Sequence, residues 1–280
     1  MPNKNRQSNY LIDAENVEEM ARLNQQAKLL NEHLSLLPAS VSLPPDARVL
    51  DIGCGPGQWV LDFAQQYPQN PVMGIDISKI MIAYAQACAQ ERHLATTDFQ
   101  WMDARNLTFP AHSFDFIHGR LLVGFMTRST WPGLLQRCFH MLRPGGIFCS
   151  IEVENLFANS PALNQVNTWM VQALWKADHA FVPQGQVMGM LAAQEPLLRK
   201  AGFKTRQELI VANFSYGCPL YAPLVEVYAQ TYLLLRPFIV RSGQATEEEA
   251  AQTVEKAIAE MHHPDFSALG CYHRVWGQVP

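Results

Sequence analysis

A glycine-rich turn directly after a short apolar run constrains this chain more than any other feature. The run covers residues 48–52, and Gly53, Gly55 and Gly57 follow it at alternating positions. Residues 58–67 then have the pattern of a helix. Glycine has no Cβ, so such a turn can take positive φ values and lets a ligand approach the backbone closely. A strand, a glycine turn and a helix N-terminus in this order predict a nucleotide-sized site at the carboxyl edge of a parallel sheet.

The spacing of the glycines, G-x-G-x-G, narrows the kind of ligand. Dinucleotide-binding folds use G-x-G-x-x-G, and a phosphate loop ends in Gly-Lys-Ser or Gly-Lys-Thr. The turn contains no Lys or Arg to neutralise a phosphate. Two carboxylates end the next two predicted strands, Asp76 after residues 71–75 and Asp103 after residues 97–101. A carboxylate at the first of these positions can accept hydrogen bonds from both hydroxyls of a ribose.

These motifs together resemble those of the class I S-adenosylmethionine-dependent methyltransferases of the small-molecule type. The resemblance rests on the glycine turn with Asp51 before it, on residues 74–78, on residues 102–104, on the Phe-Asp pair at 114–115 and on the Pro-Gly-Gly turn at 144–146. It implies an α/β fold, a Rossmann-like doubly wound sheet of seven strands with an antiparallel last strand and helical lid insertions. It also implies S-adenosylmethionine as cofactor and S-adenosylhomocysteine as product.

The resemblance assigns cofactor contacts residue by residue. The glycine turn would pass under the methionine and ribose, and Asp76 would bind the ribose. Asp103 would accept from the adenine amine, the amide of the next residue would bind a ring nitrogen, and the end of the fourth strand would contribute backbone contacts. The expected cofactor-binding residues are Asp51, Gly53, Gly55, Gly57, Asp76, Ile77, Asp103, Ala104, Gly119, Arg120, Tyr10 and Gln25.

An amphipathic helix is predicted before the nucleotide fold. Apolar residues recur at helical spacing over residues 12–30, and Asp13 is the expected N-cap. The helix either packs against the fold or closes over the cofactor as a lid. As a lid it would bring Tyr10, Arg22 and either Gln25 or Gln26 to the ligands.

Polar and aromatic residues near the carboxyl edge are candidates for contact with the molecule that accepts the methyl group. An amine acceptor needs only a neutral lone pair, whereas an oxygen acceptor benefits from a general base. The candidate catalytic residues are His118, Glu154 and His179. Phe125, Asn155, Trp169 and Trp175 are candidates for substrate binding. The sequence contains no metal-ligand cluster of recognisable spacing, so we expect no metal.

The expected organisation is a helical lid over residues 1–45 and a methyltransferase domain over residues 46–280. Two helical cap insertions are expected in that domain, at about 156–185 and about 217–265. We find no internal repeat and no clear linker.

Composition and charge argue against several other classes of protein. The net charge is −4 without a basic run, which disfavours nucleic acid as a partner. The longest apolar stretch, residues 224–240, contains Glu226, Arg236 and Pro237, so we do not expect a membrane span. Residues 1–9 are polar, and the six cysteines have no C-x-x-C pair, as in a cytoplasmic protein with reduced thiols. We expect a monomer or a homodimer.

The predicted function is methyl transfer from S-adenosylmethionine to oxygen, nitrogen or another nucleophile of a small molecule. Aromatic residues in the predicted caps favour an aromatic or apolar acceptor of the secondary-metabolite kind. Two alternatives stay open. One is a methyltransferase-like fold that binds the cofactor but catalyses another reaction, such as ring closure. The other is a binding module. The glycine spacing disfavours a nicotinamide-dependent dehydrogenase.

Overall fold

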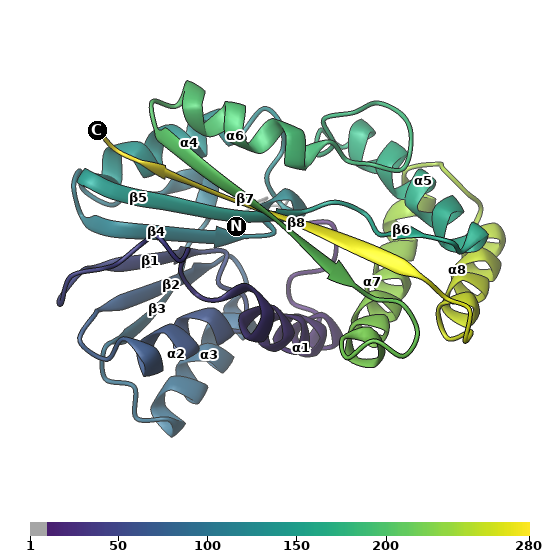
Figure 1. Cartoon of the computed structure of the whole chain (residues 1–280), viewed down its shortest axis with the longest axis horizontal. Coiled ribbons are helices and arrows are strands. Elements are labelled where there is room, and N and C mark those ends of the chain that lie inside the picture. The colour runs from purple at the N-terminus through teal and green to yellow at the C-terminus, as the bar shows by residue number, and fades with distance from the viewer. Residues whose placement is uncertain (1–9) are drawn as a thin grey trace, which may run out of the picture.

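The computed structural model describes residues 10–280 and shows one mixed sheet between layers of helices (Figure 1). Met1–Asn9, which belong to the predicted helical lid, lie outside the described residues, so this part of the lid stays a prediction. The strands are β1 (Val49–Ile52), β2 (Val72–Asp76), β3 (Thr97–Trp101), β4 (Phe114–Arg120), β5 (Leu142–Val153), β6 (Phe157–Ala158), β7 (Lys204–Asn213) and β8 (Ala268–Gln278).

The sheet has the order β3-β2-β1-β4-β5-β8, with β6 and β7 also paired to β8. Strands β1 to β5 are mutually parallel, and β8 runs antiparallel to its neighbours. The predicted doubly wound fold with an antiparallel last strand is therefore confirmed. The sheet has eight strands, however, where seven were expected. The eighth is the two-residue β6, which pairs with the part of β8 that extends beyond β5.

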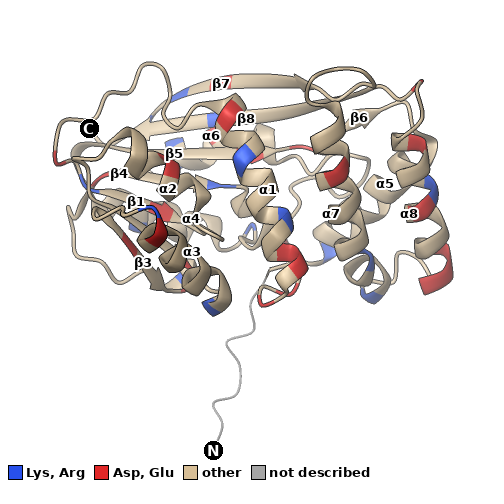
Figure 2. Cartoon of the chain, turned by 90° about the horizontal axis from the view of Figure 1, so that it is seen from below, with Lys and Arg blue, Asp and Glu red and all other residues tan. Residues whose placement is uncertain are grey.

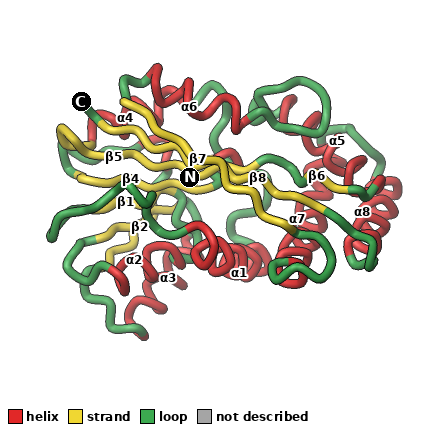
Figure 3. The backbone as a smooth tube through the Cα atoms, in the orientation of Figure 1, coloured by secondary structure: helices red, strands yellow, loops and turns green. Residues whose placement is uncertain are grey.

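Helices cover both faces of the sheet and its carboxyl edge (Figures 1 and 3). One layer lies on each face, and a third group of helices stands beyond the edge where β1 and β4 end. The first layer comprises α1 (Val17–Leu34), α2 (Gln58–Gln66) and α3 (Lys79–Glu91), and the opposite layer comprises α4 (Trp131–Met141) and α6 (Met190–Lys200). The third group comprises α5 (Pro161–Lys176), α7 (Tyr221–Arg241) and α8 (Glu247–Met261). Two short 3-10 helices, η1 (Ala104–Asn106) and η2 (Leu122–Gly124), follow β3 and β4.

Helix α1 links the sheet layer to the third group, because it contacts both α2 and α7. Its N-cap is Asn16, whose side chain accepts from the N–H groups of Glu18 and Glu19. The expectation of Asp13 as N-cap is wrong, since its carboxylate accepts from the N–H of Glu15 in the preceding turn. The segments expected as lid and caps thus surround the carboxyl edge, while the division into residues 1–45 and 46–280 stays a prediction.

Charged side chains of both signs occur on the helices, and both α1 and α8 carry blue and red segments in Figure 2. At the edge of the sheet away from the glycine turn, Asp115 accepts from the N–H of Arg48 at 2.8 Å and pairs with Arg143 at 2.9 Å.

None of the helices within residues 10–280 is both long and apolar enough to cross a membrane. All six cysteines are unpaired.

Candidate active site

The three glycines of the turn after β1 all have positive φ values, but they meet different surroundings. A Cβ on Gly55 (φ +53°) would fit without a clash, in ordinary contact with Sδ of Met81 at 3.8 Å and Cδ1 of Leu23 at 3.9 Å. On Gly57 (φ +83°) it would lie 2.7 Å from the Cβ of Ala85, so this glycine permits α2 to approach α3. On Gly53 it would lie 2.9 Å from the ring of Phe125. Gly55 is therefore the position where the turn leaves room for a ligand.

Asp76 ends β2 beside this turn. Its two carboxylate oxygens accept from the N–H groups of Gly55 and Ser78, each at 2.9 Å. Burial raises the pKa of Asp76, and the two backbone N–H groups act in the opposite direction. Each oxygen keeps a second lone pair for a further donor. The carboxylate is thus held rigidly at the cavity wall and can still accept from two hydroxyl groups.

Asp103 follows β3 and caps the 3-10 helix η1. Its carboxylate accepts from the backbone N–H of Arg105 at 2.9 Å and pairs with the Arg105 guanidinium at 2.9 Å. Asp103, Ala104 and Met102 all line the same cavity as Asp76. The pairing of Asp103 with Arg105 was not predicted from the sequence, although the two residues stand only two positions apart.

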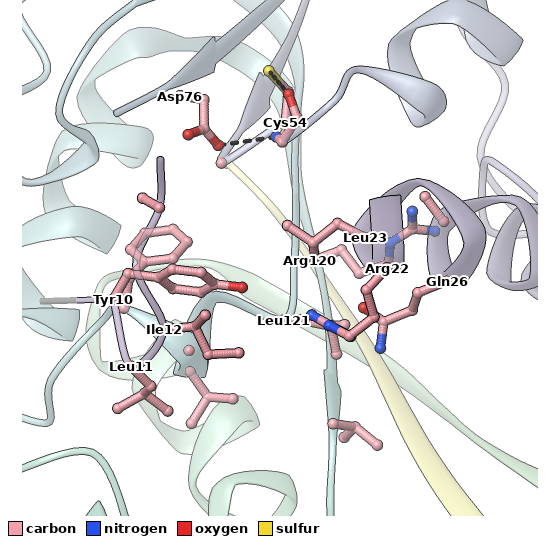
Figure 4. Close-up of a pocket in the computed structure, with 18 of the residues that line it drawn as sticks. Tyr10, Leu11, Ile12, Arg22, Leu23, Gln26, Cys54, Asp76, Arg120 and Leu121 are labelled. Atoms are coloured by element: carbon pink, nitrogen blue, oxygen red, sulfur yellow. Dashed lines mark hydrogen bonds between the residues drawn. The ribbon is translucent and has the colours of Figure 1, made fainter. Parts of the chain in front are cut away.

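The cavity continues from the glycine turn to the underside of α1 (Figure 4). In that view Tyr10, Leu11 and Ile12 lie on one side, Arg22, Leu23 and Gln26 of α1 on the other, and Cys54 and Asp76 at the end nearest the sheet. Gln25 does not line the cavity and is exposed, whereas Gln26 does line it. Adjacent residues of a helix point about 100° apart, so only the docked orientation of α1 decides between them.

A buried polar network holds the roof of the cavity together. The hydroxyl of Tyr10 donates to Glu19 at 2.5 Å, and Arg22 donates to both oxygens of Glu19 at 2.7 Å. Arg22 also donates to the hydroxyl of Thr231 in α7 at 3.1 Å. Burial and the neighbouring Glu19 raise the pKa of Tyr10, which keeps its phenol protonated. The network ties the segment before α1 to both lid helices. Glu19 and Thr231 were not predicted, because only the fold brings them together.

The three candidate bases all have partners within the protein. His118 donates from Nδ1 to Asp51 at 2.7 Å and stacks on Trp59 with ring centroids 4.0 Å apart. Burial lowers the pKa of His118, so the ring is neutral at pH 7. Its Nε2 is buried and has no hydrogen-bond partner among the described residues. His118 lines the cavity, although this nitrogen itself is not exposed to solvent.

Glu154 and Asn155 lie in the cavity wall and fasten the loop before α6. The carboxylate of Glu154 accepts from the N–H groups of Met188 and, at 3.0 Å, Gly189. Asn155 donates from Nδ2 to the carbonyl of Gln186 at 2.7 Å. His179 donates from Nδ1 to the carbonyl of Val123 at 2.8 Å and does not line the cavity. Burial raises the pKa of Glu154 and lowers that of His179.

Only some of the aromatic candidates for substrate binding line the cavity. Phe125 lines the cavity, whereas Trp169 and Trp175 do not, and the neighbouring Met170 and Leu174 take their place. The ring of Trp175 stacks on the guanidinium of Arg128 at 3.8 Å. Of the remaining cofactor candidates, Asp51, Ile77 and Arg120 line the cavity, while Gly57 and Gly119 lie outside it.

Glu152 is a buried carboxyl behind this wall that the sequence did not single out. It accepts from the N–H groups of Leu122 and Val123 at 3.0 and 3.2 Å and so orients the loop that carries Phe125. Burial raises the pKa of Glu152 to about 8, and these donors act against the shift. The side chain therefore couples the loop beside the cavity to pH.

We expect the stability that Glu152 contributes to fall as pH rises from about 4.5 to about 8. In this range the folded protein retains a proton that the unfolded chain has released, so unfolding becomes easier with rising pH. The free energy of unfolding, measured with urea, should fall relative to the Glu152→Gln variant by up to about 1.4 kcal/mol per pH unit. Glu32→Gln, on the exposed face of α1, serves as control. Parallel pH curves for wild type and Glu152→Gln would contradict the prediction.

Comparison with known proteins agrees with this geometry. Residues 49–146 match the family model described as a methyltransferase domain. The chain is 28% identical to the methyltransferase pytC of Aspergillus terreus over 179 residues, which cover 63% of this chain and 51% of the relative. It is 34% identical to the trans-aconitate 2-methyltransferase of Deinococcus radiodurans over 111 residues, 40% of each chain. The chain thus spans about half the length of the pytC relative.

The fold has solved counterparts as well. The crystal structure of the YcgJ protein of Bacillus subtilis superposes with a TM-score of 0.53 at 18% identity, covering 92% of this chain and 97% of that protein. The matched segment, residues 49–146, is a methyltransferase domain, and the strand order and the glycine turn with its two carboxylates agree with that match. These findings support a class I S-adenosylmethionine-dependent methyltransferase, with S-adenosylmethionine as its cofactor.

Proposed function

We propose that this chain transfers a methyl group from S-adenosylmethionine to a small-molecule acceptor. One observation carries the proposal: a single cavity runs from the glycine turn and its two carboxylates to a compartment under the lid helices. That compartment is mostly apolar, and apart from Phe125 the residues named here lie outside the matched segment, in α5, in α7 and in the loop before α6. Its wall includes Phe125, Met170, Leu174, Met188, Leu235, Tyr228 and Tyr232.

The residues at the sheet edge fit the cofactor. Gly55 lines the cavity with no side chain of its own, Asp76 offers two acceptor oxygens for the ribose, and Asp103 with Ala104 lies beside the predicted adenine position. When bound, S-adenosylmethionine supplies a methyl group on a positively charged sulfur. The protein holds the adenosine and the acceptor in line and excludes water under α1 and α7. Such alignment can lower a barrier by several kcal/mol, ~7 or more in well-oriented systems.

The chain's own groups favour alignment over strong base catalysis. Glu154 is engaged by two backbone N–H groups, and His118 and His179 each donate from Nδ1 to a protein acceptor. An acceptor that presents a neutral amine or an already ionised oxygen would need no base. The name of the Deinococcus radiodurans relative specifies such an ionised acid, trans-aconitate. A roofed cavity also suits a small molecule better than a segment of a macromolecule.

The test is methyl transfer by the purified chain to a panel of small carboxylic acids, phenols and amines. We expect methylated product and S-adenosylhomocysteine in equal amounts, measured by mass spectrometry, and no transfer to a peptide mixture or to RNA. Asp76→Ala is the matched control for cofactor-dependent turnover. Consumption of an acceptor without S-adenosylhomocysteine would instead favour a non-methylating reaction. Tight cofactor binding without turnover across the panel would favour a binding module.

A further inference from the structure

Arg120 is a cation at the cavity wall that forms no ion pair with the described part of the chain. It ends β4, lines the cavity, and donates from Nη1 to Oδ1 of Asn31 in α1 at 2.8 Å. Within residues 10–280 its guanidinium makes no salt bridge. Six other arginines in this range are at least partly buried, and each pairs with a carboxylate, for example Arg22 with Glu19, Arg105 with Asp103 and Arg274 with Glu208. Arg120 is the exception among them.

This arrangement costs free energy in the ligand-free protein. Burial lowers the pKa of Arg120 to about 10, so the group still carries its charge at neutral pH. The two nearby acids are engaged elsewhere, Asp51 by His118 and Asp62 by Asn31 and Gln58. A buried charge without a direct partner is unfavourable unless an anion joins it. The cavity beside Arg120 is the place from which such an anion can come.

The position of Arg120 relative to Asp76 indicates which anion fits. Asp76 ends β2, and β1 lies between β2 and β4 in the sheet. Neighbouring strands are about 4.8 Å apart, so the ends of β2 and β4 are about 10 Å apart along the carboxyl edge. S-adenosylmethionine carries its carboxylate at the end of the molecule opposite adenosine. With the adenine at Asp103 after β3 and the ribose at Asp76 after β2, the methionine end would extend over the glycine turn after β1, in the direction of β4.

Asn31 gives the guanidinium a fixed orientation. Its Oδ1 accepts from Arg120, while its Nδ2 donates to Asp62 at 2.6 Å. The contact joins α1, α2 and β4 at one point, so an anion bound by Arg120 would lie beside the end of the lid helix.

We propose that the guanidinium of Arg120 binds a carboxylate inside the cavity. Its place in the sheet favours the amino-acid carboxylate of the cofactor, and a carboxylate on the acceptor is the other source of the same chemistry. The inference rests on the proposed use of S-adenosylmethionine. It assigns a side-chain role to a residue that the family resemblance implicates only through its backbone.

The test compares two ligands that differ in this group. S-adenosylhomocysteine has the amino-acid end, and 5′-methylthioadenosine lacks it. In isothermal titration calorimetry, Arg120→Met should weaken S-adenosylhomocysteine binding by about tenfold or more and leave 5′-methylthioadenosine binding unchanged. Arg120→Lys keeps the positive charge and should lose less affinity for S-adenosylhomocysteine than Arg120→Met does. Lys28→Met removes the same charge from the exposed face of α1 and should change neither affinity.

Thermal unfolding supplies a second readout that separates a ligand role from a structural one. Without ligand, Arg120→Met should unfold at a higher temperature than wild type, because it removes an unpaired buried charge. A residue with a purely structural role would give a lower temperature. If both nucleoside affinities stay unchanged, but trans-aconitate with saturating S-adenosylhomocysteine stabilises wild type and not Arg120→Met, the acceptor is the source of the carboxylate.

Two results would overturn the inference, and they are distinguishable from failure of the proposed function. Equal loss of affinity for both nucleosides would show a general defect of the site. Unchanged affinities without carboxylate-dependent stabilisation would show that Arg120 binds no carboxylate. If wild type does not bind S-adenosylhomocysteine, the proposed function itself is contradicted. The cofactor is then also excluded as the source of the carboxylate that Arg120 binds.

Discussion

Asp76→Ala is expected to weaken S-adenosylmethionine binding by about a hundredfold or more. Each ribose hydroxyl would lose a hydrogen bond to a charged acceptor, worth about 1.5–3 kcal/mol. The variant also leaves the N–H of Gly55 without its acceptor, and this N–H belongs to the turn that forms the cavity wall. Isothermal titration calorimetry with S-adenosylmethionine and S-adenosylhomocysteine measures the effect.

Two further variants make the Asp76 experiment specific. Asp76→Asn keeps the size of the side chain but removes the charge and one acceptor oxygen, so its affinity should lie between those of wild type and Asp76→Ala. Asp98→Ala removes a carboxylate from an exposed position of β3 and should bind as wild type does. Wild-type affinity of Asp76→Ala would remove Asp76 from the cofactor site.

Gly55→Val should abolish cofactor binding while the helical circular dichroism signal persists. The new side chain would extend from the cavity wall between Met81 and Leu23, and a β-branched residue is also unfavourable at φ +53°. Calorimetry should detect no binding, and far-ultraviolet circular dichroism should resemble that of wild type. Full affinity would mean that the glycine turn is not the cofactor site.

Gly57→Val is the matched comparison two residues further along. Here the added Cβ would lie 2.7 Å from that of Ala85 and 2.9 Å from the ring of Phe99, so α2 and α3 could not keep their distance. We expect a clear loss of thermal stability, in contrast to the binding defect of Gly55→Val. The pair separates a glycine that makes room for a ligand from one that makes room for a helix.

The lid is the part of the site where sequence reasoning was least exact. Periodicity predicted a helix over α1 and a possible role in closing the site, but it placed the N-cap at Asp13 and favoured Gln25. Both depend on the rotation and entry angle of the helix, which its contacts with α2 and α7 determine. The network of Tyr10, Glu19, Arg22 and Thr231 shows the same dependence, since its last member is over two hundred positions away in the chain.

The sequence by itself determined the sheet class and the edge of the sheet where the candidate cofactor residues meet. Parallel strands that alternate with helices bring the carboxyl ends of β1, β2 and β3 to one edge, so Gly55, Asp76 and Asp103 must meet there. Local order along the chain was sufficient for this result, because each residue follows directly on a strand whose place in the sheet is set by the fold class.

The tertiary structure alone decided the acceptor side. Met170 and Leu174 line the cavity in place of Trp169 and Trp175, because helix packing selects which face of α5 turns inward. The same packing buried Nε2 of His118 and engaged Glu154 with the loop before α6, and among residues 10–280 it gave neither that nitrogen a hydrogen-bond partner nor Arg120 a carboxylate. Contacts between distant segments fix side-chain direction and charge pairing, and no local pattern in the sequence contains them.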